Sequence, residues 1–386
     1  MLLHINEYLT GCGIGKSFPF AVFSPGRINV IGEHTDYTGG LVMPAAIDKG
    51  IEFYARPVDG GAMRMHAVDL GEIYELSLPV VRDKTGELWV DYLAGIIHEF
   101  QLLGYEVPAL EIVFGGNVPR GSGMSSSAAL EGGMAFLLNE VLAAGISRPQ
   151  LAVLSQRSSN NYIGVPTGIM DQFASLNGSA DGPIRLNCDT LEFSTVVADV
   201  PGYSWLLVNS MIMHELGGSE YPARVRECAE ALAAIVTQHP DVSCLSLATE
   251  DQLKSVADQL NETVFRRAHY VISENKRVLA MEAALCRGDV AEAGELLNAT
   301  HAGLRDDFAV SCPEVDFLQQ EAVVGFPETV MGSRLMGGGF GGCTINLVKT
   351  AGIHALKNHL LSTYFDQYGK RPEFYEVNIG PGTRLI

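Results

Sequence analysis

This sequence lacks the usual marks of disulfide-rich, membrane and nucleic-acid-binding proteins. Its seven cysteines are scattered and never spaced as C-x-x-C, which argues against a disulfide framework or a zinc site. No apolar run approaches the roughly 18 residues needed to span a bilayer, so we expect no membrane segment. Basic residues number 26 against 45 acidic ones, and the net charge of −19 disfavours nucleic acid as a partner.

Length and termini set further expectations. The first residues, Met1 to Glu7, show no basic region followed by an apolar run and a cleavage site, so we expect a cytoplasmic protein. A chain of 386 residues, 47% of them hydrophobic, is long enough for two domains. We place these at residues 1–200 and 201–386, both of α/β type, and we expect a monomer.

The stretch from Pro119 to Leu130, PRGSGMSSSAAL, is typical of a phosphate-binding loop. A strand-like run precedes it, and an Ala- and Leu-rich helical run follows it at 128–144. Glycines let backbone N–H groups turn toward a ligand, and the first turn of a helix adds unpaired donors and the positive end of its dipole. A plain helix cap is the alternative, but a cap needs one serine, whereas this stretch has three after two spaced glycines.

A second stretch, residues 24–40, concentrates ionisable groups between glycines. Glu33, His34 and Asp36 fall within four residues of a segment that we predict to be a loop. One His and two carboxylates this close together match no defined metal-ligand spacing, whereas several hydrogen-bonding groups suit a polyhydroxylated ligand. A solvated turn is the alternative that composition leaves open.

Asp171 is a lone carboxylate among apolar residues, directly after the Pro/Gly turn at 164–168. A buried carboxylate must be paired or functional, although this one could also cap a helix. Two apparent nucleotide motifs fail in context: Gly-Lys-Ser at 15–17 lacks the first P-loop glycine, and G-x-G-x-x-G at 337–342 precedes a strand-like run instead of a helix. We therefore predict neither a P-loop nor a dinucleotide-binding fold.

The remaining pattern predicts strands and helices in both halves. We expect strands at 20–23, 110–118, 205–208, 344–348 and 374–379, helices at 89–100, 128–144, 221–234 and 353–364, and a mostly helical region at 246–324 with a polar break at 304–307.

Three stretches together resemble the GHMP small-molecule kinase superfamily, which includes galactokinase, homoserine kinase, mevalonate kinase and phosphomevalonate kinase. Residues 119–129 look like its nucleotide loop, 26–40 are similar to the galactokinase signature in particular, and 332–344 resemble the third motif. Further likeness occurs at 168–173, 219–228 and 304–314. The resemblance implies a two-domain α/β fold, with an N-terminal ribosomal protein S5 domain 2-like domain, a C-terminal ferredoxin-like domain and the active site in the cleft between them.

The resemblance also implies roles for individual residues. Asp171 matches the residue beside the reacting hydroxyl, which we predict to be the general base, and Arg27 matches a cation that keeps it ionised and lies near the transferred phosphate. The residues implied to bind the sugar are Glu33, His34, Asp36, Gly168 and Tyr221. Those implied to bind the nucleotide are Trp89, on the adenine side, and Gly121, Ser122, Gly123, Met124, Ser125, Ser126 and Ser127, with Ser126 also a ligand of Mg²⁺.

One position departs from the family pattern. Twelve residues before Asp171 the family usually has a Glu that helps to hold magnesium, and this chain has Ser159. A neutral hydroxyl is a weaker Mg²⁺ ligand than a carboxylate. A bridging water, another acid or ATP itself must then supply the missing contact.

Taken together, these features predict ATP-dependent phosphorylation of the anomeric hydroxyl of α-D-galactose, with Mg²⁺ as cofactor and galactose 1-phosphate as product. One alternative is a kinase for N-acetylgalactosamine or another galactose-like sugar, because selectivity at the second sugar carbon depends on pocket volume. The other is a sensor that binds galactose and ATP without turnover, for which Ser159 is the one argument.

Overall fold

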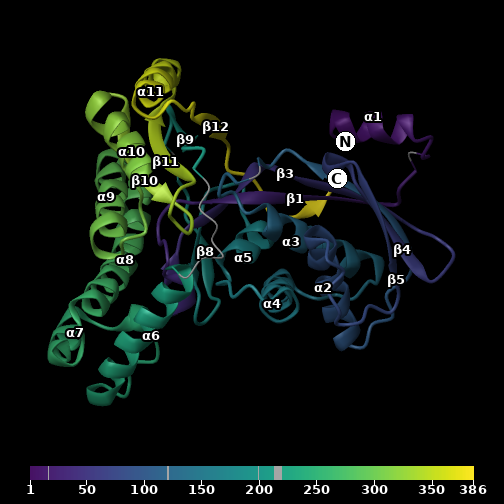
Figure 1. Cartoon of the computed structure of the whole chain (residues 1–386), viewed down its shortest axis with the longest axis horizontal. Helices are drawn as coiled ribbons and strands as arrows, with labels where there is room; N and C mark the ends of the chain where they lie inside the picture. Colours follow the sequence, from purple (N-terminus) through teal and green to yellow (C-terminus); the bar gives the residue numbers. More distant parts are fainter. Residues whose placement is uncertain (16, 120, 199, 213–219) are drawn as a thin grey trace.

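The computed structural model describes residues 1–15, 17–119, 121–198, 200–212 and 220–386. Arg120 of the predicted phosphate loop and Ser219, where one of the resembling stretches begins, lie outside the described residues. The chain forms two halves, which Figure 1 shows as an N-terminal sheet with its helices and a C-terminal group of helices around a second sheet.

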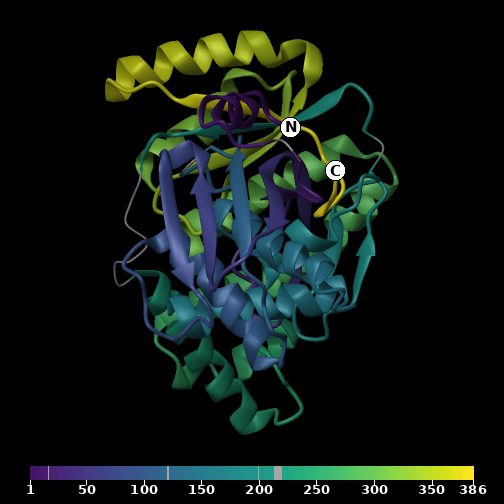
Figure 2. The same cartoon turned by 90° about the vertical axis from the view of Figure 1, so that its right-hand side faces the viewer.

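The N-terminal half is built on a six-stranded sheet, whose strands lie side by side in Figure 2. The strand order is β13 (Arg384–Leu385), β1 (Phe20–Asn29), β3 (Pro44–Pro57), β6 (Leu110–Gly116), β4 (Ala62–Ala67) and β5 (Glu72–Ser77). Neighbouring strands are antiparallel, except β4 and β6, which are parallel.

Strand β1 corrects the sequence prediction. It was expected only at 20–23, but it continues to Asn29 and so includes the start of the segment predicted to be a loop. The pairing with β3 shifts register between Pro25 and Arg27, which lets the strand continue past a proline that has no N–H to donate.

Helices cover both faces of this sheet. One face carries α2 (Leu88–Leu102), α3 (Ser126–Val141), α4 (Arg148–Ser158) and α5 (Met170–Asn177), and the other carries α1 (Leu3–Gly11). Successive residues of β3 point to opposite faces: Phe53 packs in the cluster that includes α2 and α3, whereas Tyr54 packs with Ile5 of α1. The sheet therefore has two buried faces.

The C-terminal half is built on an antiparallel sheet of order β10 (Val330–Met336), β11 (Cys343–Lys349), β9 (Tyr203–Asn209) and β12 (Glu373–Val377). One face packs on α10 (Pro313–Gly325) and α11 (Ile353–Tyr368), and the other packs on α8 (Glu262–Cys286) and α9 (Val290–Ala302). Helices α6 (Glu220–Gln238) and α7 (Glu250–Ser255) pack beside α8. The smaller strands β2 (Leu41–Val42), β7 (Ile184–Asn187) and β8 (Phe193–Thr195) form a third sheet.

The polar break predicted at 304–307 is a second correction. Residues Gly303–Asp307 form a turn of π-helix directly after α9, so the helical winding continues through them. Such turns are frequent at functional sites.

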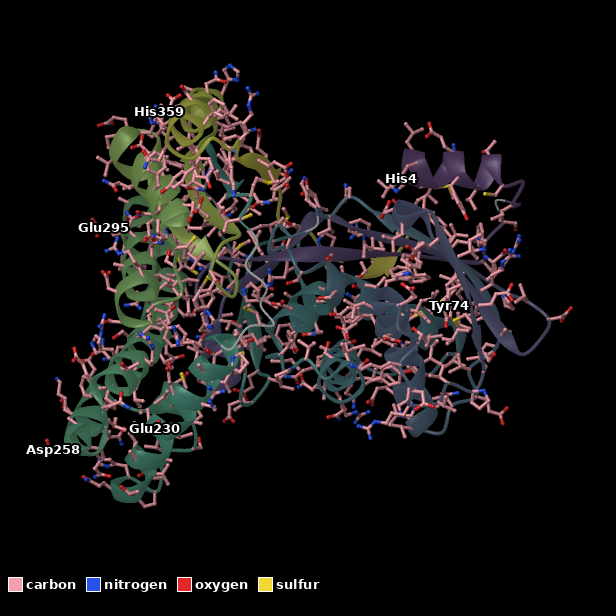
Figure 3. The ribbon with its side chains drawn as sticks, viewed as in Figure 1. His4, Tyr74, Glu230, Asp258, Glu295 and His359 are labelled. Atoms are coloured by element: carbon pink, nitrogen blue, oxygen red, sulfur yellow. The ribbon has the colours of Figure 1, made fainter. Side chains whose placement is uncertain are left out.

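The surface reflects the acidic composition. Glu230, Asp258 and Glu295, which Figure 3 labels on the C-terminal helical region, are all exposed. None of the helices in the described residues combines the length and apolarity needed to cross a bilayer.

The division into domains at residue 200 stays a prediction. The C-terminal residues Arg384 and Leu385 pair with β1 and so belong to the N-terminal sheet.

Candidate active site

A pocket of about 570 Å³ brings together residues from several segments that are distant in sequence. Its lining includes the following predicted site residues: Arg27, Glu33, His34, Asp36, Gly121, Ser122, Gly123, Met124, Ser125, Ser126, Ser127, Gly168, Asp171 and Tyr221. Tyr221 lies in the first turn of α6 in the C-terminal half, whereas the others come from the N-terminal half. Residues Gly337 and Gly338 of the third motif complete the wall.

Arg27 and Asp171 form a bidentate pair in this pocket. Nε of Arg27 lies 2.7 Å from Oδ1 of Asp171, and Nη2 lies 2.8 Å from Oδ2. Arg27 stands on β1 and Asp171 in the first turn of α5, so two rigid elements fix the geometry. Nη1 of Arg27 also donates to the carbonyl of Gly123. The pair is therefore joined directly to the predicted phosphate loop.

The predicted phosphate loop ends in the first turn of α3. Gly121, Gly123 and Ser125 have φ values of 69°, 70° and 55°, in the left-handed region. Ser125 occupies the N-cap position of α3 but makes no side-chain cap; its hydroxyl donates to Oδ2 of Asp171 instead. The capping alternative thus does not describe Ser125, whose side chain satisfies none of the first-turn N–H groups of α3.

The ionisable loop residues face the same pocket. His34 is buried with φ 62°, and its Nδ1 lies 3.0 Å from the Tyr37 hydroxyl. Its Nε2 is buried without a hydrogen-bond partner in the described part of the chain. Burial, helped by the nearby Arg224 cation, lowers the pKa of His34 to about 3, so the ring is neutral.

The pKa of Asp36 is shifted in the opposite direction to that of His34. Burial, followed by the negative charges of Asp171 and Glu33, raises the pKa of Asp36 to about 7. A Cβ atom on Gly168 would lie 1.7 Å from Oδ2 of Asp36, so only glycine allows this close approach. The backbone of Gly168 and the carboxylate of Asp36 are thus adjacent in the pocket wall.

Trp89 lies in a neighbouring cavity of about 420 Å³. Ser126 and Ser127 line both cavities, so the two meet at the first turn of α3. The indole Nε1 donates to Oε2 of Glu72 at 2.6 Å. Trp89 thus lines a cavity that adjoins the pocket of the Arg27–Asp171 pair, and its place on the adenine side stays a prediction.

Ser159 is not a pocket residue. It is buried, and its hydroxyl donates to Glu131 with distances of 2.7 and 2.9 Å to the two carboxylate oxygens. Burial raises the pKa of Glu131 to about 8, against hydrogen bonds from Ser159 and Gln172 that lower it. No sequence motif marks Glu131, although its position four residues after Ser127 places both on one face of α3.

The donor set for a metal is small. Within the described residues, no group of three or more His, Cys, Asp or Glu side chains could hold a metal ion. Near the predicted phosphate loop, the pocket offers the Ser126 hydroxyl and the Asp171 carboxylate, whereas Glu131 is fully buried and does not line the pocket. Such a set fits a Mg²⁺ ion that is bound mainly by substrate phosphates and water.

Comparisons with known proteins agree with this arrangement. The model of the galactokinase galactose-binding signature matches residues 14–57, and those of the GHMP kinase N-terminal and C-terminal domains match 91–179 and 281–364. The galactokinase of Roseiflexus sp. is 36% identical over 95% of this chain and 92% of its own length. The galactokinase of Bacillus subtilis is also 36% identical, over 94% of each chain. The crystal structure of Lactococcus lactis galactokinase complexed with galactose has a TM-score of 0.93 at 34% identity, covering 99% of this chain and 98% of that one.

The chain belongs to the galactokinase family.

As a member of the galactokinase family, the protein is a kinase with the two-domain GHMP fold, and both the superfamily assignment and the predicted α/β fold are confirmed. Mevalonate kinase of Methanococcus jannaschii shares that fold, with a TM-score of 0.66 at 15% identity over 94% of this chain and 99% of its own. The roles of individual site residues stay predictions.

Proposed function

We propose that this galactokinase-family protein transfers the γ-phosphoryl group of ATP to the anomeric hydroxyl of α-D-galactose, giving galactose 1-phosphate and ADP. The observation that carries the proposal is the bidentate Arg27–Asp171 pair, which is bonded to the phosphate loop through Gly123 and Ser125. It shares one pocket with Glu33, His34 and Asp36. Phosphoryl transfer needs alignment and charge neutralisation more than covalent chemistry, and this pocket supplies groups for both.

At the sugar end, Glu33, His34, Asp36, Gly168 and Tyr221 bind the hydroxyls. The neutral ring of His34 offers its buried Nε2, which has no partner in the described part of the chain. Asp36 and Glu33 offer carboxylate oxygens, and the Gly168 backbone stands beside Asp36. Hydrogen bonds from several directions fix one orientation of a polyhydroxylated ring, so the reacting hydroxyl faces Asp171.

At the phosphate end, the N–H groups of residues 121–127 and the start of α3 hold the triphosphate, and Trp89 lines the adenine side. Asp171 accepts the proton of the sugar hydroxyl, and Arg27 balances charge between Asp171 and the transferred phosphoryl group. Ser126 is the residue that would contact Mg²⁺. When bound, the ion neutralises charge on the β- and γ-phosphates.

We also propose a cytoplasmic location and a monomeric state. All seven cysteines are free thiols, which fits a reducing compartment. Gel filtration at micromolar concentration tests the monomer directly, and a dimer peak would contradict it.

The proposal is tested by coupled ADP release with Mg²⁺-ATP and, in parallel, galactose, galactosamine, N-acetylgalactosamine or glucose. We expect galactose to give the highest kcat/KM. A higher kcat/KM for N-acetylgalactosamine than for galactose would favour the alternative of an N-acetylgalactosamine kinase. Absence of ADP release at millimolar galactose, together with galactose binding by calorimetry, would favour a sensor.

A further inference from the structure

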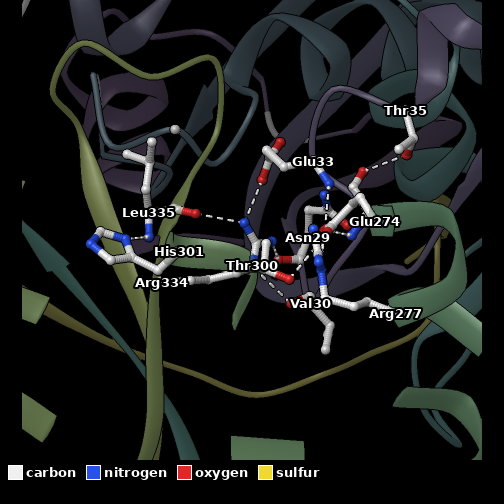
Figure 4. A network of polar contacts seen from close by, with 12 residues as sticks. Asn29, Val30, Glu33, Thr35, Glu274, Arg277, Thr300, His301, Arg334 and Leu335 are labelled. Carbon is white, nitrogen blue, oxygen red and sulfur yellow. Dashed lines mark hydrogen bonds and ion pairs between the residues drawn. The ribbon is translucent and has the colours of Figure 1, made fainter. Parts of the chain in front are cut away.

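Gly32 and Glu33, in the stretch predicted to bind the sugar, are bonded to side chains of the C-terminal half of the molecule. Nη1 of Arg334, on β10, lies 2.8 Å from Oε2 of Glu33. Oε1 of Glu274, on α8, accepts hydrogen bonds from the backbone N–H of Gly32 at 2.8 Å and of Glu33 at 3.3 Å. The hydroxyl of Tyr270 donates to the Glu33 carbonyl at 3.0 Å. Figure 4 shows Glu33 and Glu274 drawn together in this network.

Arg334 is fully buried and uses its whole guanidinium group. Beyond Glu33, it donates to the carbonyl of Val30 at 3.0 Å and to those of Asn29 and Leu335, as Figure 4 shows. These carbonyls lie at the end of β1 and on β10, so one planar fork joins strands from the two halves. A lysine ammonium cannot reach acceptors in this fixed planar pattern.

Glu274 is likewise fully buried, and its second oxygen is engaged. Oε2 accepts hydrogen bonds from Nε of Arg277 at 2.7 Å and from the Thr300 hydroxyl at 2.9 Å. The network thus pairs two acidic with two basic side chains, so the charges of Glu33 and Arg334 are balanced away from water. Oε2 of Glu33 accepts from Arg334, and Glu33 also lines the pocket, so the network and the pocket meet at this side chain.

From this geometry we propose that Arg334 and Glu274 are positioning residues that set the place of Glu33 for sugar binding; this inference rests on the function proposed above. Neither residue lines the pocket. They act through the carboxylate and the backbone of Glu33. Their loss therefore weakens galactose binding far more than nucleotide binding.

The experiment compares Arg334→Lys with Arg185→Gln. Arg185 of β7 also makes an ion pair with α8, with its Nη1 2.9 Å from Oε2 of Glu282, but within the described residues it makes no hydrogen bond or ion pair with residues 29–35. Dissociation constants for galactose and for a non-hydrolysable ATP analogue are measured by titration calorimetry. We expect Arg334→Lys to raise the galactose Kd by about 10- to 100-fold and the analogue Kd by less than about 3-fold, with Arg185→Gln close to wild type.

The proposal would be overturned if folded Arg334→Lys bound galactose with wild-type affinity. It would also be overturned if the Kd values for galactose and for the analogue rose equally, because that would indicate a general loss of structure. If Arg334→Lys does not fold, Glu274→Gln decides by the same two constants, since it keeps the side-chain shape and removes the charge. Wild-type protein that binds the analogue but not galactose would overturn the proposed function itself, and the positioning role with it.

Discussion

At the scale of single residues, the pocket is organised around one carboxylate with three neighbours. Asp171 receives two hydrogen bonds from Arg27 and one from Ser125, and it lies near enough to Asp36 to raise the pKa of that residue. The guanidinium of Arg27 and the hydroxyl of Ser125 fix the orientation of the Asp171 carboxylate. This fixed orientation suits Asp171 to the role of general base that we propose for it.

Replacing Asp171 by Asn tests this role. The amide keeps the shape but cannot accept the proton, so we expect kcat to fall by about 10²- to 10⁴-fold, with KM for galactose much less affected. Steady-state kinetics at saturating Mg²⁺-ATP measure both parameters. A variant with near-normal turnover would show that Asp171 only positions its neighbours.

Glu131 provides a pH-dependent prediction that does not depend on activity. Its folded-state pKa is raised from 4.5 to about 8 by burial. Below pH 4.5 both folded and unfolded chains hold the proton. As pH rises from 4.5 to 8, the unfolded chain loses its proton first, so the folded state loses stability until about pH 8.

Glu131→Gln removes this dependence. We expect the variant to gain stability over wild type as pH rises, by at most about 5 kcal/mol at pH 9. Urea unfolding at pH 5, 7 and 9 gives the free energies, and Glu295→Gln, an exposed change, serves as the control. A difference between Glu131→Gln and wild type that does not change with pH would contradict the prediction.

The residues that could be read from the sequence share one property: they belong to contiguous motifs. Glu33, His34 and Asp36 lie in one such stretch, and residues 121–127 in another, and all of them line the pocket. Glu131 was not anticipated, because its significance depends on burial and on contact with Ser159, 28 residues away. Such contacts are set by the packing of α3 on α4 and α5, which local patterns do not encode.

At the scale of elements, helices were predicted better than strands. The amphipathic run at 89–100 is α2, Leu88–Leu102, because helical periodicity spans several turns. Strand β3, Pro44–Pro57, was missed, since it is buried on both faces and therefore shows no polar alternation. The end of β1 was also missed, because the polar residues after position 23 are typical of a loop.

Close packing between α9 and β10 matters because β10 carries Arg334. A Cβ atom on Gly294 would lie 2.0 Å from the carbonyl oxygen of Met331, which is backbone and cannot turn aside. We expect Gly294→Ala to lower the free energy of unfolding by about 1–3 kcal/mol, despite the better helix propensity of Ala. Chemical denaturation measures this loss.

The matched control is Glu295→Ala, one residue further along α9 and exposed, as its outward position in Figure 3 shows. We expect it to change the free energy of unfolding by no more than about 0.5 kcal/mol. If Gly294→Ala were as stable as this control, the two elements would be able to separate without cost, and the close approach would not be a constraint.

At the scale of the whole molecule, the chain returns to the N-terminal sheet after completing the C-terminal one. Residue Thr383 is fully buried; its hydroxyl donates to the Ser175 carbonyl at 3.0 Å and lies 3.1 Å from the Ser24 hydroxyl. Ser24 precedes Arg27 on β1, and Ser175 follows Asp171 by one turn on α5. The tail thus ties together the two elements that carry the Arg27–Asp171 pair.

Thr383→Val should therefore affect both stability and catalysis. Valine preserves the shape but removes one hydrogen bond from the Ser175 carbonyl, which keeps the Thr383 backbone N–H, and one from the Ser24 hydroxyl, which keeps the Ser175 hydroxyl. We therefore expect the free energy of unfolding to fall by about 0.5–1.5 kcal/mol. Because the tie between β1 and α5 loosens, kcat should fall while KM for galactose stays close to wild type. Thr363→Val, on helix α11, removes a hydroxyl that donates to the His359 carbonyl within the same helix, and it should leave kcat unchanged. If Thr383→Val had reduced stability but wild-type kcat, the C-terminal tail would stabilise the N-terminal sheet without affecting the Arg27–Asp171 pair.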